Sequence, residues 1–258
     1  MNTIDNFPVE RILFQNEACL VINKLPGESS ENPITGNGGD KFPAPVHRLD
    51  TPVSGCLLYA RTREAAAFLG AAFAKNAEHV LAADTHFIEK RYWAIVEIPA
   101  DEISERLGEN TKAEAELVHW LYENKKLNKS FALPWKEGNA PHRRNCAPPK
   151  KAILRYRIIG KGDRYLFLEA ALVTGRHHQI RAQLAAIGLR IKGDLKYGAR
   201  RSEKTGCIRL HAFSLSFPNP LNSAEIIHVR ADPPLDDSLW QAFTAAKMNT
   251  AAAKITGA

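Results

Sequence analysis

Two strand-type runs joined by a short turn constrain the fold more than any other feature. Residues 151–160 (KAILRYRIIG) and 165–173 (YLFLEAALV) are rich in aliphatic and aromatic residues, and the connecting KGDR is a turn signal. Runs so close along the chain predict an antiparallel hairpin. The chain must therefore build part of its sheet from antiparallel strands.

The remaining segments extend this prediction to the whole chain. Strands are predicted at residues 18–24, 55–62, 91–98, 116–122 and 207–217, the last with a bulge near His211. Helices are predicted at residues 63–75, 177–188 and 233–247, with Thr174 as a cap and Gly188 as the end of the second, and Asp232 and Pro233 at the start of the third. Residues 26–45 and 125–150 are predicted loops.

Strands outnumber helices and occur in hairpins, which is typical of an α+β fold. We expect a mixed, largely antiparallel central sheet flanked by helices and loops. No linker divides the sequence cleanly, so we expect one domain over residues 1–247 and a disordered tail over residues 248–258.

Composition indicates a globular protein of 258 residues, with 45% hydrophobic and 24% charged residues. The four cysteines, Cys19, Cys56, Cys146 and Cys207, are far apart in the sequence, so we expect free thiols. No apolar run reaches the roughly 20 residues of a membrane helix, and the N-terminus lacks a signal-peptide pattern. We therefore expect a cytoplasmic protein with no membrane partner.

Positive charge is concentrated in one part of the chain. The net charge is +7, and residues 125–157 contain ten Lys or Arg and one acid, Glu137. Such a segment is either a solvated loop or the electrostatic footprint of a polyanion. Trp135 and His142 lie within it and can stack on bases. Charge alone leaves nucleic acid and an acidic membrane surface as alternatives.

Three polar residues are candidates for chemistry. Asp50 follows a Pro-rich loop and precedes a buried strand, where it is either a turn former or a catalytic carboxylate. Arg181 flanks the apolar stripe of its predicted helix, so it either reaches solvent or is partly buried beside a carboxylate. Tyr92 begins a strand and is either a core residue or lines a cleft.

Histidines give no metal motif. His177 and His178 are adjacent, and on a helix their side chains point about 100° apart, so they are not expected to share one ion. No HxxxH pattern occurs. We expect no metal site.

Several stretches resemble the motifs of the RluA-type family of RNA pseudouridine synthases, in the same order. HRLDTPVSGCLLYART (47–62) resembles HRLDxxTSGLLLxAKT, and IEKRYWAIVE resembles a Lys-x-Tyr-x-Ala-x-Val strand. TGRHHQIRAQLAAIGLRIKGDLKYG is similar to TGRTHQIRxHLxxxGxPIxGDxxYG, IRLHAFSLSFPNP to LxLHAxxLxFxHP, and ILFQNEACLVINKLPG to ILYEDxxLLVVNKPxG. The likeness covers roughly residues 10 to 234. Val53, His177 and Arg190 depart from the family pattern.

The resemblance implies an enzyme that needs no cofactor or metal and turns uridine into pseudouridine in RNA. It places Asp50 as the catalytic carboxylate, acting as a nucleophile at C1′ or as a base at C2′. It places Arg181 beside Asp50 and Tyr92 against the uracil, where it can also help remove the C5 proton. It implies that the target uridine flips out of the RNA stack and that Arg48 fills the space that its base leaves.

The resemblance and the basic segment together predict an RNA partner, either rRNA or tRNA, and a monomer. Expected RNA contacts are His47, Arg48, Arg176, His178, Lys125, Lys126, Arg143 and Arg144. Little sequence precedes the first motif, so we expect no S4-type RNA-binding domain. Two other functions remain as alternatives: a non-catalytic RNA-binding or RNA-folding protein, and a base-removing glycosylase.

Overall fold

The computed structural model describes residues 3–4, 7–31, 43–78, 88–98, 114–136, 138, 143–203, 206–234 and 237–255. The chain divides into two compact units. The first contains Met1–Tyr92, Thr205–Cys207 and His211–Pro233, and the second contains Trp93–Lys204, Ile208–Leu210 and Pro234–Ala258. The strands are mostly antiparallel and the helices are few, so the predicted α+β fold is confirmed.

The first unit is built on strands in the order β3-β4-β6-β12-β13, with β5 also paired to β6. Their bounds are β3 Ile12–Gln15, β4 Cys19–Lys24, β5 Ala44–Pro45, β6 Ser54–Ala60, β12 Leu210–Asn219 and β13 Asn222–Arg230. β1 (Thr3–Ile4) and β2 (Phe7–Pro8) form a separate ladder, followed by the short helix η1 (Val9–Arg11). Among the strand pairs of this unit formed by described residues, β6 and β12 are parallel and the others are antiparallel.

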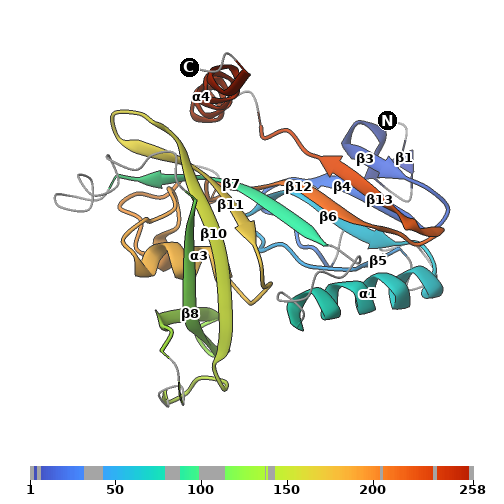
Figure 1. The fold of residues 1–258 in the computed structure, drawn as a ribbon, viewed down its shortest axis with the longest axis horizontal. Coiled ribbons are helices and arrows are strands. Elements are labelled where there is room, and N and C mark those ends of the chain that lie inside the picture. The colour runs from blue at the N-terminus through green and yellow to red at the C-terminus, as the bar shows by residue number, and fades with distance from the viewer. Residues whose placement is uncertain are drawn as a thin grey trace. The chain divides into compact units, whose positions relative to one another are not determined.

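β6 is the centre of the first unit, and every one of its residues is buried. Its unbroken apolar sequence fits this position, because a strand covered on both faces needs no polar alternation. Helix α1 (Arg63–Glu78) packs beside β6 and contributes Leu69 to the main core cluster (Figure 1). The Thr62 hydroxyl accepts a hydrogen bond from the Ala65 amide at 3.1 Å and caps the first turn.

β7 crosses the boundary between the two units at Tyr92/Trp93, and the strands of the second unit follow the order β7-β11-β10-β8-β9. Their bounds are β7 Glu89–Glu97, β8 Ala115–Asn124, β9 Lys129–Pro134, β10 Lys150–Lys161 and β11 Tyr165–Leu172. β10 and β11 form the predicted hairpin, with Arg157 opposite Glu169. The remaining elements are α3 (Gln179–Ala186), η2 (Leu195–Tyr197) and α4 (Ser238–Ile255). Figure 1 shows α3 beside β8 and β10.

The predicted loop over residues 125–150 is wrong in part. β9 lies inside it and pairs with β8 from His119↔Pro134 to Asn124↔Lys129. The many basic side chains of this stretch favoured a loop in the prediction. An edge strand, however, accepts charged residues on its open side. Residues 32–42 of the other predicted loop, and His142, lie outside the described residues.

Two predicted boundaries are also wrong. α3 begins at Gln179, and Thr174 does not cap it; His178 precedes the helix in a left-handed conformation. α4 begins at Ser238, where Asp237 Oδ1 accepts hydrogen bonds from the amides of Leu239 and Trp240. The β12–β13 pair begins at Ser214 and its register shifts at Pro218/Asn219, so the bulge expected near His211 stays a prediction.

The C-terminal helix reaches further than expected. α4 continues to Ile255, beyond the end predicted at residue 247, and the disordered tail expected over residues 248–258 stays a prediction. The single domain expected over residues 1–247 stays a prediction. No helix among the described residues is long and apolar enough to cross a membrane. All four cysteines are free thiols, as predicted.

Gly55 shows how tightly β6 and β12 approach each other. Its φ is +114°, and an added Cβ would lie 2.3 Å from the backbone oxygen of Ala212. Both the conformation and the contact exclude a side chain.

We expect Gly55→Ala to lower the free energy of unfolding by about 3 kcal/mol or more, because strained backbone and overpacking add. Gly70→Ala is the matched control: Gly70 lies in α1 and nothing lies within 4 Å of its added Cβ. That substitution should raise stability by about 0.5–1 kcal/mol. Urea unfolding followed by circular dichroism measures both, and equal stabilities for the two variants would contradict the close contact.

Candidate active site

Asp50 lies in a short loop that is fixed on both sides. Before it, Leu49 exchanges two hydrogen bonds with the buried hydroxyl of Ser30, at 2.8 and 3.0 Å. The Asp50 carbonyl accepts a bond from the Val53 amide at 2.9 Å, which closes a turn into β6. After it, the Thr51 carbonyl accepts a bond from the Gly27 amide at 2.8 Å. The carboxylate is therefore carried by a preorganised backbone.

Lys24, at the end of β4, completes this fixation. Its side chain is 1% exposed, and the ammonium donates to the carbonyls of Leu25, Glu28 and Thr51 at 2.9, 2.9 and 3.2 Å. Three acceptors match the three donors of an ammonium group. Burial lowers the Lys24 pKa to about 8. Sequence analysis did not select Lys24, because a lone lysine is normally a surface residue.

Tyr92 and Asp50 are close enough to interact electrostatically. Tyr92 is 6% exposed in β7. Burial raises the pKa of Tyr92 above its usual range, and the Asp50 carboxylate and Cys56 raise it further. The phenol is consequently protonated at neutral pH, and its ring lies near the carboxylate. A flat ring beside a carboxylate is an arrangement that can hold a planar ligand while the acid acts on it.

His47 anchors the same loop from the other end. Its Nε2 accepts a hydrogen bond from the Leu58 amide at 3.3 Å, and its ring stacks on Phe73 at 5.3 Å. Lys90 Nζ lies over the same Phe73 ring, 4.6 Å from its centroid. Burial, followed by the Lys90 charge, lowers the pKa of His47 to about 3. These contacts give His47 a structural role, and its predicted RNA contact stays a prediction.

Arg48 is the most accessible of the predicted residues in this loop. Its side chain is 72% exposed and forms an ion pair with Glu31 at 2.7 Å. Glu31 is itself 62% exposed. An exposed pair of this kind contributes little to stability, so Arg48 can leave Glu31 at small cost.

In the second unit, Arg181 is 5% exposed and forms a two-point pair with Asp194, at 2.7 and 2.8 Å. The predicted partly buried arginine beside a carboxylate is confirmed, and the solvent-exposed alternative is wrong. Asp194 is 1% exposed and precedes η2, and the Tyr197 ring lies 4.9 Å from the Arg181 guanidinium carbon. Asp194 was missed as a functional residue, although it lies in the quoted stretch IKGDLKYG.

The two adjacent histidines were expected at the start of a helix, but they precede α3. Their rings stack with centroids 3.8 Å apart. His178 is 8% exposed, and its Nδ1 lies 3.0 Å from the Tyr197 hydroxyl. Burial and neighbouring charges, Arg181 first, lower the His178 pKa to about 2. A neutral, buried ring disfavours the RNA contact predicted for His178.

The other predicted RNA contacts differ in their surroundings. Lys125, Lys126 and Arg144 are exposed, and the Arg143 guanidinium lies over the Phe131 ring at 4.1 Å. Arg176 Nε is buried and has no hydrogen-bond acceptor among the described residues. A buried donor without an acceptor is costly, which indicates that a ligand can complete its bonding. No group of His, Cys, Asp and Glu within the described part of the chain is arranged to hold a metal ion.

Asp50 and Tyr92 belong to the first unit, and Arg181, Arg176 and the basic segment to the second. The structure thus places the carboxylate and the tyrosine together. The expected pairing of Asp50 with Arg181 stays a prediction.

Comparison with known proteins identifies the family. Residues 21–186 match the family described as RNA pseudouridylate synthase. Ribosomal large subunit pseudouridine synthase D of Zymomonas mobilis is 28% identical over 87% of this chain and 69% of its own length. tRNA pseudouridine synthase C of Haemophilus ducreyi is 30% identical over 76% of this chain and 74% of its own. The structure of human RNA pseudouridylate synthase domain containing 1 aligns with a TM-score of 0.60 and 21% identity, covering 96% of this chain and 97% of that one.

The buried pair between Arg181 and Asp194 predicts a large penalty when one partner is neutralised. We expect Asp194→Asn to lower the free energy of unfolding by about 3–5 kcal/mol, because it leaves a buried guanidinium without its counter-charge. Glu116→Gln is the matched control, since Glu116 is 44% exposed and pairs with an exposed Arg155. Chemical unfolding of both variants measures the difference. A loss below 1 kcal/mol in Asp194→Asn would contradict the buried pair.

The lowered pKa of His47 predicts an acid-sensitive loop. Folded His47 binds a proton only near pH 3, whereas the unfolded side chain binds one near pH 6.5. The unfolded state therefore holds more protons between these values, and His47 makes stability fall as the pH falls from 6.5 to 3. We expect His47→Gln to lose less free energy of unfolding than the unmodified protein as the pH falls from 6.5 to 3. Urea unfolding at stepped pH measures both proteins. Parallel curves for the two proteins would contradict the assignment.

Proposed function

The chain belongs to the RNA pseudouridylate synthase family, and we propose that it converts specific uridines of rRNA or tRNA into pseudouridine with Asp50 as the catalytic carboxylate. The observation that carries the residue assignment is the Asp50 loop, which is held by Lys24, Gly27 and Ser30 and lies near a buried tyrosine. The named relatives act on ribosomal and transfer RNA, which supports these two substrate classes for this chain.

The reaction is an isomerisation that conserves the atoms of the nucleotide. The C1′–N1 bond of uridine breaks, the uracil turns, and a C1′–C5 bond forms. The C5 proton leaves to water and N1 takes up a proton, so no oxidant or reductant is required. Asp50 supplies the carboxylate next to the sugar, either by attacking the electron-poor C1′ or by removing a proton at C2′.

Tyr92 supports the chemistry as a platform for the base. Its raised pKa keeps the phenol protonated, which favours stacking on the uracil over proton removal at C5 in the resting enzyme. Because Tyr92 lies close to Asp50, a uracil stacked on its ring would be held beside the reacting sugar.

Arg181 is proposed as the cation that keeps Asp50 ionised and oriented. The pair with Asp194 uses two guanidinium N–H groups of the five that arginine carries. Asp194 then acts as a positioning residue, because it fixes the plane in which Arg181 presents its other donors.

RNA binding requires that the target uridine leave its stack, which costs a few kcal/mol. Arg48 is proposed to fill the space that the base leaves, and its exposed, weakly paired side chain suits this movement. The proposed phosphate contacts are Arg176, Lys125, Lys126, Arg143 and Arg144. His47 and His178 are also predicted RNA contacts, but their side chains are less accessible. The cytoplasmic location, the monomeric state and independence from metal ions stay predictions.

A non-catalytic RNA-binding protein would not require the acid, the tyrosine and the arginine together, and this chain has all three. A glycosylase would release free uracil, whereas an isomerase retains the base. The two alternatives are therefore separated by the product.

We expect purified protein to release tritium from ribosomal or transfer RNA transcripts labelled at uridine C5. Asp50→Asn should reduce this release by about a thousandfold, because it removes the charged carboxylate. Binding of the same RNA should change little. Asp163→Asn, at the exposed β10–β11 turn, is the matched control and should react like the unmodified protein.

Turnover retained in Asp50→Asn would refute the role of this carboxylate. Free uracil among the products would favour the glycosylase. No release from isolated or partly assembled ribosomal and transfer RNA, with binding intact, would favour the non-catalytic protein.

A further inference from the structure

A second basic site lies in the second unit, on the flank of α3 that faces β9. It is a pocket of about 340 Å³, lined by Lys129, Ser130, Phe131, Ala132, Arg143, Ala182, Ala185, Ala186, Arg190, Tyr197 and Gly198. This volume falls near the lower end of the range for small-ligand pockets. None of the residues proposed above for catalysis lines the pocket.

The charges of the pocket are of one sign. Among the described residues that line it, the charged ones are Lys129, Arg143 and Arg190, and none is acidic. Within the described residues, none of the three forms an ion pair with a carboxylate. By contrast, Arg155 and Arg157 on neighbouring β10 are paired with Glu116 and Glu169. Three cations around one cavity that have no carboxylate partner among the described residues indicate an anionic ligand.

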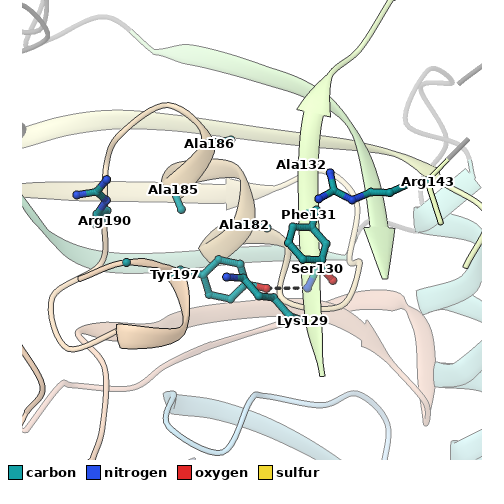
Figure 2. A pocket seen from close by; sticks show the side chains of 11 residues that line it. Lys129, Ser130, Phe131, Ala132, Arg143, Ala182, Ala185, Ala186, Arg190 and Tyr197 are labelled. Atoms are coloured by element: carbon teal, nitrogen blue, oxygen red, sulfur yellow. Dashed lines mark hydrogen bonds between the residues drawn. The ribbon is translucent and has the colours of Figure 1, made fainter. Parts of the chain in front are cut away.

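The shape of the pocket adds a second requirement. Ala182, Ala185 and Ala186 of α3 and Ala132 of β9 give it small apolar side chains. In the view of Figure 2, Arg190 lies on one side of the α3 alanines and Arg143 on the other. A ligand that fits this arrangement has a flat apolar part in the middle and negative charge at both ends.

The cations are held in position by the protein. Arg143 lies over the Phe131 ring at 4.1 Å, and Lys129 lies 5.1 Å from the Tyr197 ring centroid. Arg190 contacts Gly198, whose added Cβ would lie 3.2 Å from the Arg190 Nε. The Tyr197 hydroxyl accepts a hydrogen bond from the Ser130 amide at 2.8 Å, which ties η2 to β9 (Figure 2). Stacked cations lose little further freedom when a ligand binds.

We propose that this pocket binds one nucleotide of single-stranded RNA outside the catalytic centre, with its base on the alanine side chains and its flanking phosphates on Arg143 and Arg190. Lys129 adds charge at the aromatic wall. Single-stranded RNA presents unstacked bases between its phosphates, whereas the bases of duplex RNA stay paired and stacked. The proposal rests on the proposed function in that it takes RNA as the ligand, and it adds a distinct point of recognition.

The test compares variants for binding of a short fluorescein-labelled oligouridylate, measured by fluorescence anisotropy over a range of salt concentrations. We expect Arg143→Ala/Arg190→Ala to bind about tenfold more weakly. The slope of log affinity against log salt should fall by about 1.4, since each single-strand phosphate contact contributes about 0.7. Lys161→Ala/Arg164→Ala removes two exposed charges at the β10–β11 turn and should leave both quantities nearly unchanged.

The Ala186→Leu variant tests whether the site is a pocket that holds a nucleotide or only a basic surface patch. Ala186 is exposed at the end of α3, so a larger side chain fills the cavity without removing charge or entering the core. We expect about fivefold weaker binding with an unchanged salt slope, because base contact is lost and phosphate contact is kept. Thermal unfolding of each variant checks that the fold is intact.

Oligouridylate binding equal to the unmodified protein, in either the double arginine variant or Ala186→Leu, would overturn the proposal. Tritium release from C5-labelled RNA at saturating concentration is measured alongside for Ala186→Leu, and it should be retained with a raised KM. Failure of the unmodified protein to release tritium would refute the proposed function alone, since the binding comparison does not depend on turnover.

Discussion

The burial of one ammonium group holds the candidate catalytic loop in place. Lys24 lies at the end of β4, and its three donors bind carbonyls from two separate stretches of chain, residues 25–28 and Thr51. Removing a cation from water is costly, and only a complete set of acceptors offsets that cost. The loop that carries Asp50 is therefore tied to β4 by an interaction that is stable only when all its parts are in place. A carboxylate presented in this way does not need to be ordered when substrate binds.

The second unit uses the same principle with a different pair. Asp194 and Arg181 are both almost completely buried, and each satisfies the other through two short hydrogen bonds. Tyr197 extends this arrangement, because its ring lies against Arg181 and its hydroxyl accepts a bond from β9. Helix α3, the η2 turn and strand β9 thus share one network. The network has an arginine with catalytic potential at one end and the second basic pocket at the other.

Local sequence patterns predicted the elements that carry a local signal in the sequence or consist of a continuous apolar run. β6, α1 and the β10–β11 hairpin follow directly from uninterrupted apolar runs, helix periodicity and a turn signal. β3, β9 and β13 were missed because they are short or polar strands whose partners alone identify them. The start of α3 was missed because Gln179 uses its own side chain to bind Thr174 and the Arg176 amide, so no conventional cap is present.

The site was predictable only where a motif marks it. Asp50, Tyr92 and Arg181 stand in stretches that resemble a known family, and their residue types suit the chemistry. Lys24 and Asp194 stand in the same stretches, but a charged residue in a sequence usually indicates a solvent-exposed surface. Their importance lies in partners distant along the chain: Thr51 for Lys24, and Arg181 for Asp194. A single sequence does not contain those distances.

The basic segment shows why charge composition alone was insufficient. Seven of its ten cations illustrate three different kinds of surroundings. Arg155 and Arg157 are neutralised by carboxylates on adjacent strands, Lys125, Lys126 and Arg144 are exposed, and Lys129 and Arg143 are stacked on rings beside a cavity. The last class lies on or next to a paired strand rather than in a long loop. Because a polyanion orders flexible side chains at an entropic cost, cations already held against aromatic rings contribute more of their attraction to binding. The same net charge in an unstructured loop would give affinity for any polyanion, whereas a fixed arrangement around a cavity can select the shape of the nucleotide between two phosphates.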